Sequence, residues 1–255
     1  MIPWLYPFVM GAAIITGVLV SRRTGGTPGL TRGQRFGLAI GAFCGGMIGA
    51  KLPFALLDWD GFLSGAAWLD NGKTLVMGLV GGYFGVEAAK WALDIRVKTG
   101  DGFAAPVAAA IAIGRLACFC GGCCAGLPTD LPVGLNFGDG IPRHPTQLYE
   151  FVFHLAAACV LIQLREYGLF RGQLIKLYII TYLIFRFLTE YVRPEPRLWL
   201  DWTVYQWAAL LLIPMFVALW VADRALPRAL LGDIARPAIA PPLGEELIQP
   251  GGGRA

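Results

Sequence analysis

Several ionisable residues stand inside stretches of the chain that are otherwise apolar, and they are the first candidates for chemistry. Arg186, Glu190 and Arg193 follow one another at spacings of four and three. These spacings place them on one face of a helix, together with Tyr182. Arg115 lies in a different apolar stretch. A charge inside a bilayer costs about 2.5–3.5 kcal/mol on insertion scales, so each of these residues needs a partner or a ligand.

Paired arginines of this kind are suited to binding an anion. A guanidinium group donates two parallel hydrogen bonds to a phosphate or a carboxylate. Arg115 and Arg186, with the acid Glu190 between the basic residues, leave positive charge that such an anion would neutralise. In the alternative interpretation, Arg186 and Glu190 only neutralise each other, and Arg193 extends to the membrane interface.

Four of the six cysteines form a second group in the pattern C-x-C-x-x-C-C, namely Cys118, Cys120, Cys123 and Cys124. Three interpretations stay open for them. A C-x-x-C pair is typical of a redox couple or a disulfide in an oxidising compartment. Several thiolates together also suit zinc or another soft metal. The third interpretation is close packing of small residues. The spacing matches no established zinc or iron–sulfur pattern, so we expect no bound metal and no cofactor.

One histidine lies in the long segment between Gly121 and Thr146, which is rich in turn residues. His144 is a candidate base or hydrogen-bond donor, and its alternative role is structural. The sequence His144-Pro145-Thr146 predicts a side-chain cap at the start of the next helix.

Membrane helices must position these residues. The chain has 255 residues, of which only 15% are charged, whereas about 25% is usual for soluble domains. Its mean hydropathy is +0.60. A span needs about 20 apolar residues, so we expect an all-α integral membrane protein with about seven transmembrane helices. The predicted spans are Ile2–Val20, Phe36–Leu57, Thr74–Leu93, Phe103–Cys120, Leu148–Leu164, Leu174–Val192 and Trp202–Ala222.

The basic residues predict the orientation, because cytoplasmic loops are enriched in lysine and arginine. The first gap between spans carries Arg22, Arg23, Arg32 and Arg35, whereas the second carries Asp58, Asp60 and Asp70. We therefore expect the N-terminus outside and the C-terminus in the cytoplasm. Residues 1–222 would form the membrane domain, and the Pro- and Gly-rich residues 223–255 a disordered cytoplasmic tail. A net charge of +4 does not indicate nucleic acid as a partner.

Glycines recur at helical spacing in the second and third predicted spans. Such faces allow two helices to approach closely, and we interpret these residues mainly as packing sites. They are Gly41, Gly45, Gly46 and Gly49, followed by Gly78, Gly81, Gly82 and Gly85.

Three motifs together resemble the prolipoprotein diacylglyceryl transferase family. The first runs from Gly114-Arg115 through Gly134, with Pro128-Thr129-Asp130-Leu131-Pro132 inside it. The second is Arg143-His144-Pro145-Thr146-Gln147-Leu148-Tyr149-Glu150, and the third extends from Tyr182 to Pro194. Weaker matches are Tyr6 and Gly49-Ala50-Lys51-Leu52, in which the family usually has arginine in place of Lys51.

The resemblance implies a bacterial inner-membrane enzyme of lipoprotein biosynthesis, with seven spans and its active face toward the periplasm or exterior. Its partners would be phosphatidylglycerol, or another anionic phospholipid, and a prelipoprotein whose cysteine thiol receives diacylglycerol. Arg115 and Arg186 would hold the phosphate, and His144 would be the base. The residues expected to bind or orient the substrate are Tyr6, Tyr182, Glu190, Arg193, Gly81 and Gly82.

The chain also departs from the family pattern, as a divergent member would. Cys118, Gly121 and Cys123 stand where the family has two asparagines and a glutamate. Val80 replaces the histidine of a His-Gly-Gly-Leu motif, although Gly81 and Gly82 remain. A rival hypothesis therefore keeps the fold without the reaction, with the cysteines serving thiol redox exchange or metal binding.

Overall fold

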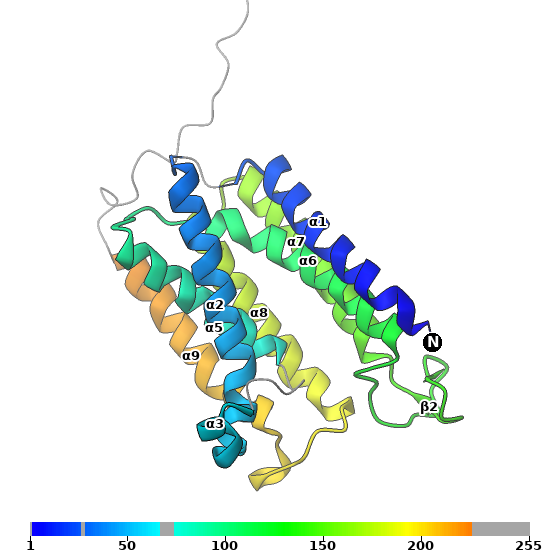
Figure 1. Ribbon diagram of the computed structural model, residues 1–255. Helices are drawn as coiled ribbons and strands as arrows, with labels where there is room; N and C mark the ends of the chain where they lie inside the picture. The colour runs from blue at the N-terminus through cyan, green and yellow to red at the C-terminus, as the bar shows by residue number, and fades with distance from the viewer. Residues whose placement is uncertain (1, 27–28, 67–73, 226–255) are drawn as a thin grey trace, which may run out of the picture.

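The computed structural model describes residues 2–26, 29–66 and 74–225 (Figure 1). These residues form a bundle of long helices with short connections. The predicted disordered tail, residues 223–255, lies almost wholly outside the described residues.

Seven long helices make up the bundle. They are α1 (Tyr6–Arg23), α2 (Arg32–Leu57), α5 (Leu75–Ala92), α6 (Gly100–Gly121), α7 (Thr146–Glu166), α8 (Leu174–Thr189) and α9 (Val204–Ala225). The shorter elements are η1 (Pro3–Leu5), α3 (Trp59–Ser64), η2 (Glu190–Val192), η3 (Trp199–Asp201) and the two-residue strands β1 (Leu135–Asn136) and β2 (Pro142–Arg143).

Each predicted span coincides with one of the long helices, although the ends differ by a few residues. The predicted helical class is thereby confirmed. Four helices are long and apolar enough to cross a membrane on length and composition alone: Arg32–Ala55, Gly100–Gly121, Thr146–Glu166 and Val204–Arg224. Elements that the sequence did not predict lie between the spans, namely α3 and the antiparallel pair β1–β2.

The helices associate in two groups joined by α8. In one group α6 packs against both α1 and α7, and in the other α2 packs against α5. Helix α8 contacts α9, α6, α7 and α5 (Figure 1). Its buried residues, among them Tyr178, Ile179 and Tyr182, form part of the main apolar core. This central position makes α8 the element that aligns side chains from the other helices.

Glycines allow the backbones of α2 and α5 to touch. A methyl group at Gly41 would lie 2.6 Å from the Cβ atom of Ala89, and one at Gly45 would lie 2.7 Å from the Cα atom of Gly85. Real Cβ atoms essentially never come this close to a neighbour. The predicted role of these glycines in helix packing is confirmed for this pair.

The bundle has two distinct ends. We call the end where α6 and α8 finish and α7 and α9 begin the site end, and the opposite end the far end. At the far end, Asp223 of α9 binds Lys176 of α8 and lies 3.1 Å from the Nζ atom of Lys98. Asp101 accepts backbone hydrogen bonds from Gly172 and Leu174. These contacts fasten the loops to the helices there.

Candidate functional site

A buried carboxylate, Glu150 of α7, lies at the centre of the site end. Its Oε2 atom is 2.5 Å from Nη2 of Arg115, and its Oε1 atom is 3.1 Å from Nη1 of Arg186 and 3.2 Å from Nη1 of Arg193. The Tyr182 hydroxyl donates a hydrogen bond of 3.1 Å to Oε2. One carboxylate thus holds three arginines from three segments of the chain. We call Glu150 and the three arginines the arginine cluster.

Helical periodicity places these side chains together. Thr146, Glu150 and His154 recur every four residues and are all buried on α7. Tyr178, Tyr182 and Arg186 have the same spacing on α8. Residues four apart share one helix face, so two polar faces meet between α7 and α8.

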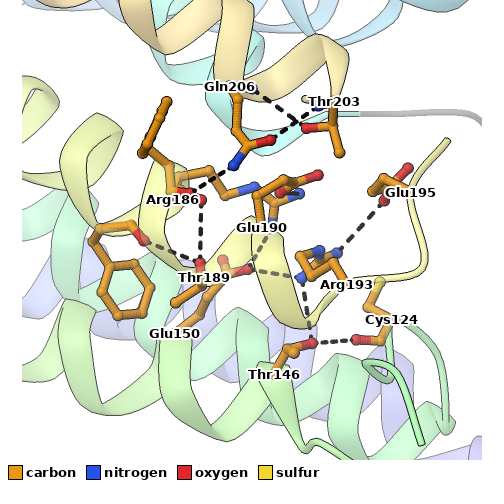
Figure 2. Close-up of polar contacts among 12 residues, drawn as sticks. Cys124, Thr146, Glu150, Arg186, Thr189, Glu190, Arg193, Glu195, Thr203 and Gln206 are labelled. Atoms are coloured by element: carbon orange, nitrogen blue, oxygen red, sulfur yellow. Dashed lines mark hydrogen bonds and ion pairs between the residues drawn. The ribbon is translucent and has the colours of Figure 1, made fainter. Parts of the chain in front are cut away.

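Arg186 has partners on three other elements of the structure. Besides Glu150, its Nη2 atom lies 3.1 Å from the Oε2 atom of Glu190. Its guanidinium carbon lies 4.9 Å from the centre of the Tyr205 ring of α9, a favourable cation–π distance. Figure 2 shows Arg186, Glu190 and Arg193 converging around Glu150. The predicted common helix face is confirmed only for Tyr182 and Arg186. Helix α8 ends at Thr189, so Glu190 lies in η2 and Arg193 follows it in an extended conformation, although both still reach the same site.

The cluster retains positive charge and unused donors. Three guanidinium groups face two buried carboxylates, those of Glu150 and Glu190. The Nε atoms of Arg115, Arg186 and Arg193 are buried without a hydrogen-bond partner. Both carboxylate oxygens of Glu190 are also buried without a hydrogen-bond partner among the described residues. Buried polar groups are normally paired, and three cations against two carboxylates leave an excess positive charge, so together they favour an anion as the missing partner. The alternative of simple neutralisation between Arg186 and Glu190 leaves these donors unexplained.

A sharp turn at the end of α6 carries the cysteines. Gly122 adopts a left-handed conformation, with φ of 71°. The amide of Cys123 donates a hydrogen bond to the carbonyl of Cys118 at 3.1 Å, and the amide of Gly122 donates one to the carbonyl of Phe119. This is a Schellman motif, which brings the residues on either side of the turn together. Cys118 and Cys123 become neighbours for this reason.

Three of the four clustered cysteines form one group. The sulfur atoms of Cys118, Cys123 and Cys124 all lie within 4.8 Å of one another. The thiols of Cys118 and Cys123 lower the pKa of Cys124 through hydrogen bonds, and the charges of Arg115 and Arg193 lower it further. We call these three residues the thiol group. Cys120 lies outside this group, and all six cysteines are free.

Helix α7 connects the thiol group to the arginine cluster. The Thr146 hydroxyl donates to the carbonyl of Cys124 at 2.6 Å, and the Gln147 amide donates to the carbonyl of Cys123. Arg193 Nη1 donates to the same Thr146 oxygen at 3.3 Å (Figure 2). Thr146 therefore makes no cap for its own helix. The predicted side-chain cap is wrong, because the hydroxyl binds the cysteine loop instead.

The other predicted site residues lie outside the arginine cluster. His144 is in the loop before α7, where its Nδ1 atom is 3.1 Å from the Tyr149 hydroxyl. Tyr6, at the start of α1, is 40% exposed and lies beside Gly121, near the thiol group. Gly81 packs against Gly49 of α2, whereas Gly82 faces a cavity.

That cavity has a volume of about 350 Å³ and lies between α2, α5, α6 and α8. Its walls are mostly apolar side chains and glycines, including Phe43 and Met47 of α2 and Phe103 and Val107 of α6. An apolar cavity of this kind matches the chemistry of a hydrocarbon chain.

Two buried polar residues were missed in the sequence. Glu150 appeared only as the end of a motif, and His154 was not considered. His154 lies 3.9 Å from Glu150 and binds the Tyr178 hydroxyl at 2.8 Å through Nδ1. The spacing of Thr146, Glu150 and His154 was the available signal, because it predicts one polar face on an otherwise apolar helix.

Comparisons with known proteins agree with this architecture. A family model described as prolipoprotein diacylglyceryl transferase matches residues 2–222. Three relatives carry the name phosphatidylglycerol–prolipoprotein diacylglyceryl transferase. The Geobacter sulfurreducens protein is 33% identical over 82% of this chain and 85% of its own length. The Solidesulfovibrio magneticus protein is 33% identical over 74% of this chain and 76% of its own length. The Clostridium tetani protein is 29% identical over 75% of this chain and 81% of its own length. This chain belongs to the prolipoprotein diacylglyceryl transferase family.

Proposed function

We propose that this chain transfers the diacylglyceryl group of phosphatidylglycerol to a cysteine thiol of a prelipoprotein. The observation that carries the proposal is the arginine cluster, which combines excess positive charge with unpaired donors beside the loop at the end of α6. Membership of the family and the names of the relatives support the same reaction.

The arginines act on the leaving group. The acceptor sulfur forms a bond to the terminal glycerol carbon of the diacylglyceryl group, and the carbon–oxygen bond to phosphate breaks. The electron pair leaves with glycerol phosphate, on which negative charge accumulates. Arg115 and Arg186 stabilise that charge through fixed hydrogen-bond donors, an effect that usually dominates such reactions. Glu150 and Tyr182 hold the two arginines in place.

The remaining site residues bind or orient the substrates in this proposal. Glu190 and Arg193 complete the headgroup site, and Tyr6 orients the headgroup from α1. His144 receives the proton of the acceptor thiol, with Tyr149 fixing its ring. One acyl chain occupies the cavity beside Gly82, which has the apolar walls that a hydrocarbon chain requires.

We further propose that the seven long helices all cross the membrane. The far end carries Arg22 and Arg23 in the last turn of α1, Arg165 in the last turn of α7, and Arg96 and Lys98 between α5 and α6. Segments rich in such basic residues remain in the cytoplasm. In the bacterial inner membrane, the N-terminus and the arginine cluster would then face the periplasm or exterior. The C-terminal tail from residue 223 would be cytoplasmic.

Complementation of a strain depleted of its own transferase tests the function. The wild-type chain is expected to restore growth, and Arg186→Ala to abolish the rescue at equal membrane expression. Arg96→Ala is the matched control, because Arg96 and its partner Asp94 are both largely exposed at the far end. Failure of the wild-type chain at full expression would contradict the proposal and favour anion binding without transfer.

A biochemical assay isolates the chemical step. Purified protein is incubated with phosphatidylglycerol and a peptide that contains a lipobox cysteine, and the thioether product is measured by mass spectrometry. The Arg186→Ala variant is expected to lose about hundredfold or more in rate, the usual cost of removing one such donor.

A further inference from the structure

We propose that Cys118, Cys123 and Cys124 bind one zinc ion through their sulfur atoms and leave its fourth coordination position open to the acceptor thiol. The metal site itself stands on the geometry of the thiol group. The role of the fourth position rests on the proposed transferase function.

The sulfur positions suit a tetrahedral metal. Zinc binds thiolates at about 2.3 Å, so two sulfurs on one zinc are about 3.8 Å apart. All three sulfurs of the thiol group lie within 4.8 Å of one another. Small side-chain rotations therefore suffice to bring them to coordination distance. Cys120, the fourth cysteine of the motif, is not part of the group.

The backbone holds the thiol group in an unfavourable conformation. Cys124 has a φ of 63°, which is uncommon for a residue other than glycine. Such strain persists only where the surroundings impose it, and it is concentrated at functional sites. Here the surroundings are Thr146 and Gln147, both 1% exposed, which bind the carbonyls of Cys124 and Cys123. Hydrogen bonds that hold the backbone of the cysteines in this way also fix the direction of their sulfur atoms.

The exposure of two cysteines and the number of thiols in the group separate this proposal from the two other interpretations, close packing and a disulfide. Cys123 and Cys124 are exposed, whereas a cysteine that only fills space is among the most buried residues. A disulfide within the group would pair two sulfurs and leave the third unused. Three converging thiols on a rigid loop are accounted for together by a metal.

The charge balance also favours a metal at this position. Three thiolates and one divalent cation carry a net charge of −1. Arg193 lies close by, since its Nη1 atom binds the same Thr146 hydroxyl that binds Cys124. With the cation bound, all three thiols can be ionised. The resulting net negative charge then lies next to the arginine cluster, whose own excess charge is positive.

An open zinc position supplies a nucleophile for thiol alkylation. A thiol that coordinates zinc loses its proton, which His144 receives as in the proposed function, and remains a nucleophile as the bound thiolate. Its sulfur then forms the carbon–sulfur bond while the carbon–oxygen bond to phosphate breaks, and glycerol phosphate takes the electron pair. No oxidant or reductant is required.

Metal analysis of the full-length protein in detergent tests the site. Protein purified without chelators is expected to contain about one zinc per chain, as for a site with three protein ligands and an open fourth position. After exchange with cobalt, the near-ultraviolet sulfur-to-cobalt charge-transfer band and the visible bands of tetrahedral cobalt should appear. Cys118→Ser, Cys123→Ser and Cys124→Ser should each lose the bound metal and these bands. Cys120→Ser, the matched control from the same segment, should keep them.

Two outcomes would overturn the proposed metal site. One is a protein that takes up neither zinc nor cobalt while its thiols remain reduced. The other is a disulfide between two members of the thiol group, found by mass spectrometry in protein isolated with thiol-blocking reagent.

Activity distinguishes this inference from the proposed function. Removing zinc with a chelator should lower the transfer rate at least tenfold, and added zinc should restore it. An active protein without metal would refute the metal role and keep the function. A zinc-loaded protein without transferase activity would refute the function and keep the metal site.

Discussion

The two ends of the bundle both contain buried charges, but they use them differently. At the far end, Lys176 and Lys98 share Asp223, and the backbone amides of Gly172 and Leu174 share Asp101. Among the described residues, none of these charged atoms is buried without a partner. At the site end, Glu150 binds three arginines whose Nε atoms have no partner.

This difference separates structural charges from functional ones. Buried polar groups with complete hydrogen bonding stabilise one conformation, whereas incomplete bonding requires a ligand or reduces stability. We therefore expect substitutions at the far end to affect stability, and substitutions at the site end to affect activity as well.

Glu150→Gln should have the largest effect. It removes the negative charge that holds three buried arginines together against their mutual repulsion, and breaking a buried ion pair on one side costs about 3–5 kcal/mol. We expect a comparable loss in the free energy of unfolding and the loss of transferase activity. Thermal unfolding in detergent and the peptide assay measure the two effects.

Glu195→Gln is the control for that substitution. Glu195 lies 4.0 Å from Arg193 and is partly exposed, so its change should cost less than about 1 kcal/mol. Equal losses of unfolding free energy and of transferase activity in the two variants would show that Glu150 has no special position in the arginine cluster.

Arg115→Lys tests whether the shape of the guanidinium group matters in addition to its charge. Lysine keeps the charge but cannot donate two parallel hydrogen bonds. We expect about a hundredfold lower transfer rate with a small change in melting temperature. Arg143→Lys, in the β1–β2 pair at the same end, should retain its activity. An unchanged rate in Arg115→Lys would remove this arginine from the phosphate site.

Asp223→Asn examines the far end. The substitution weakens the contacts to Lys176 and Lys98 and should lower the free energy of unfolding by about 1–3 kcal/mol. The transfer rate per folded molecule should be unchanged. Asp94→Asn, whose partner Arg96 is exposed, should alter neither quantity. A lower transfer rate in fully folded Asp223→Asn protein would contradict the distinction between structural charges at the far end and functional charges at the site end.

Tyr182→Phe should have the smallest effect of the series. It removes one hydrogen bond to Glu150, worth about 1 kcal/mol in stability, and should reduce the rate several-fold because the carboxylate is less well fixed. Tyr178→Phe removes the bond to His154 instead and should leave the rate nearly unchanged. A larger rate loss for Tyr178→Phe would place the reacting group nearer to His154 than to the arginines.

The sequence predicts much of this architecture because the strongest signals are local. Long apolar runs identify the helices, and the spacing of Tyr182 and Arg186 identifies one face of α8. The convergence of that face on Glu150 depends on how α7 and α8 pack, which the periodicity of a single helix does not specify. The spacing of Thr146, Glu150 and His154 does predict a polar face on α7, but it does not predict that His154 meets Tyr178 of α8.

The cysteine motif illustrates a second limit. Four cysteines within seven residues are evident in the sequence, but the choice of three of them depends on the backbone after α6. The left-handed turn at Gly122 returns the chain toward Cys118. The positive φ of Cys124 gives the chain a second turn, after which the sulfur of Cys124 lies beside the other two. Neither conformation follows a helical period, so residue spacing alone could not select Cys118, Cys123 and Cys124.

The glycine contacts between α2 and α5 have a mechanical consequence. Helices whose backbones touch cannot slide or tilt against each other without losing close contact along their whole length. We therefore expect α2 and α5 to move as one rigid body. The cavity lies between this pair and the helices α6 and α8. Any widening of the cavity would therefore have to move α2 and α5 together, as one body, away from α6 and α8.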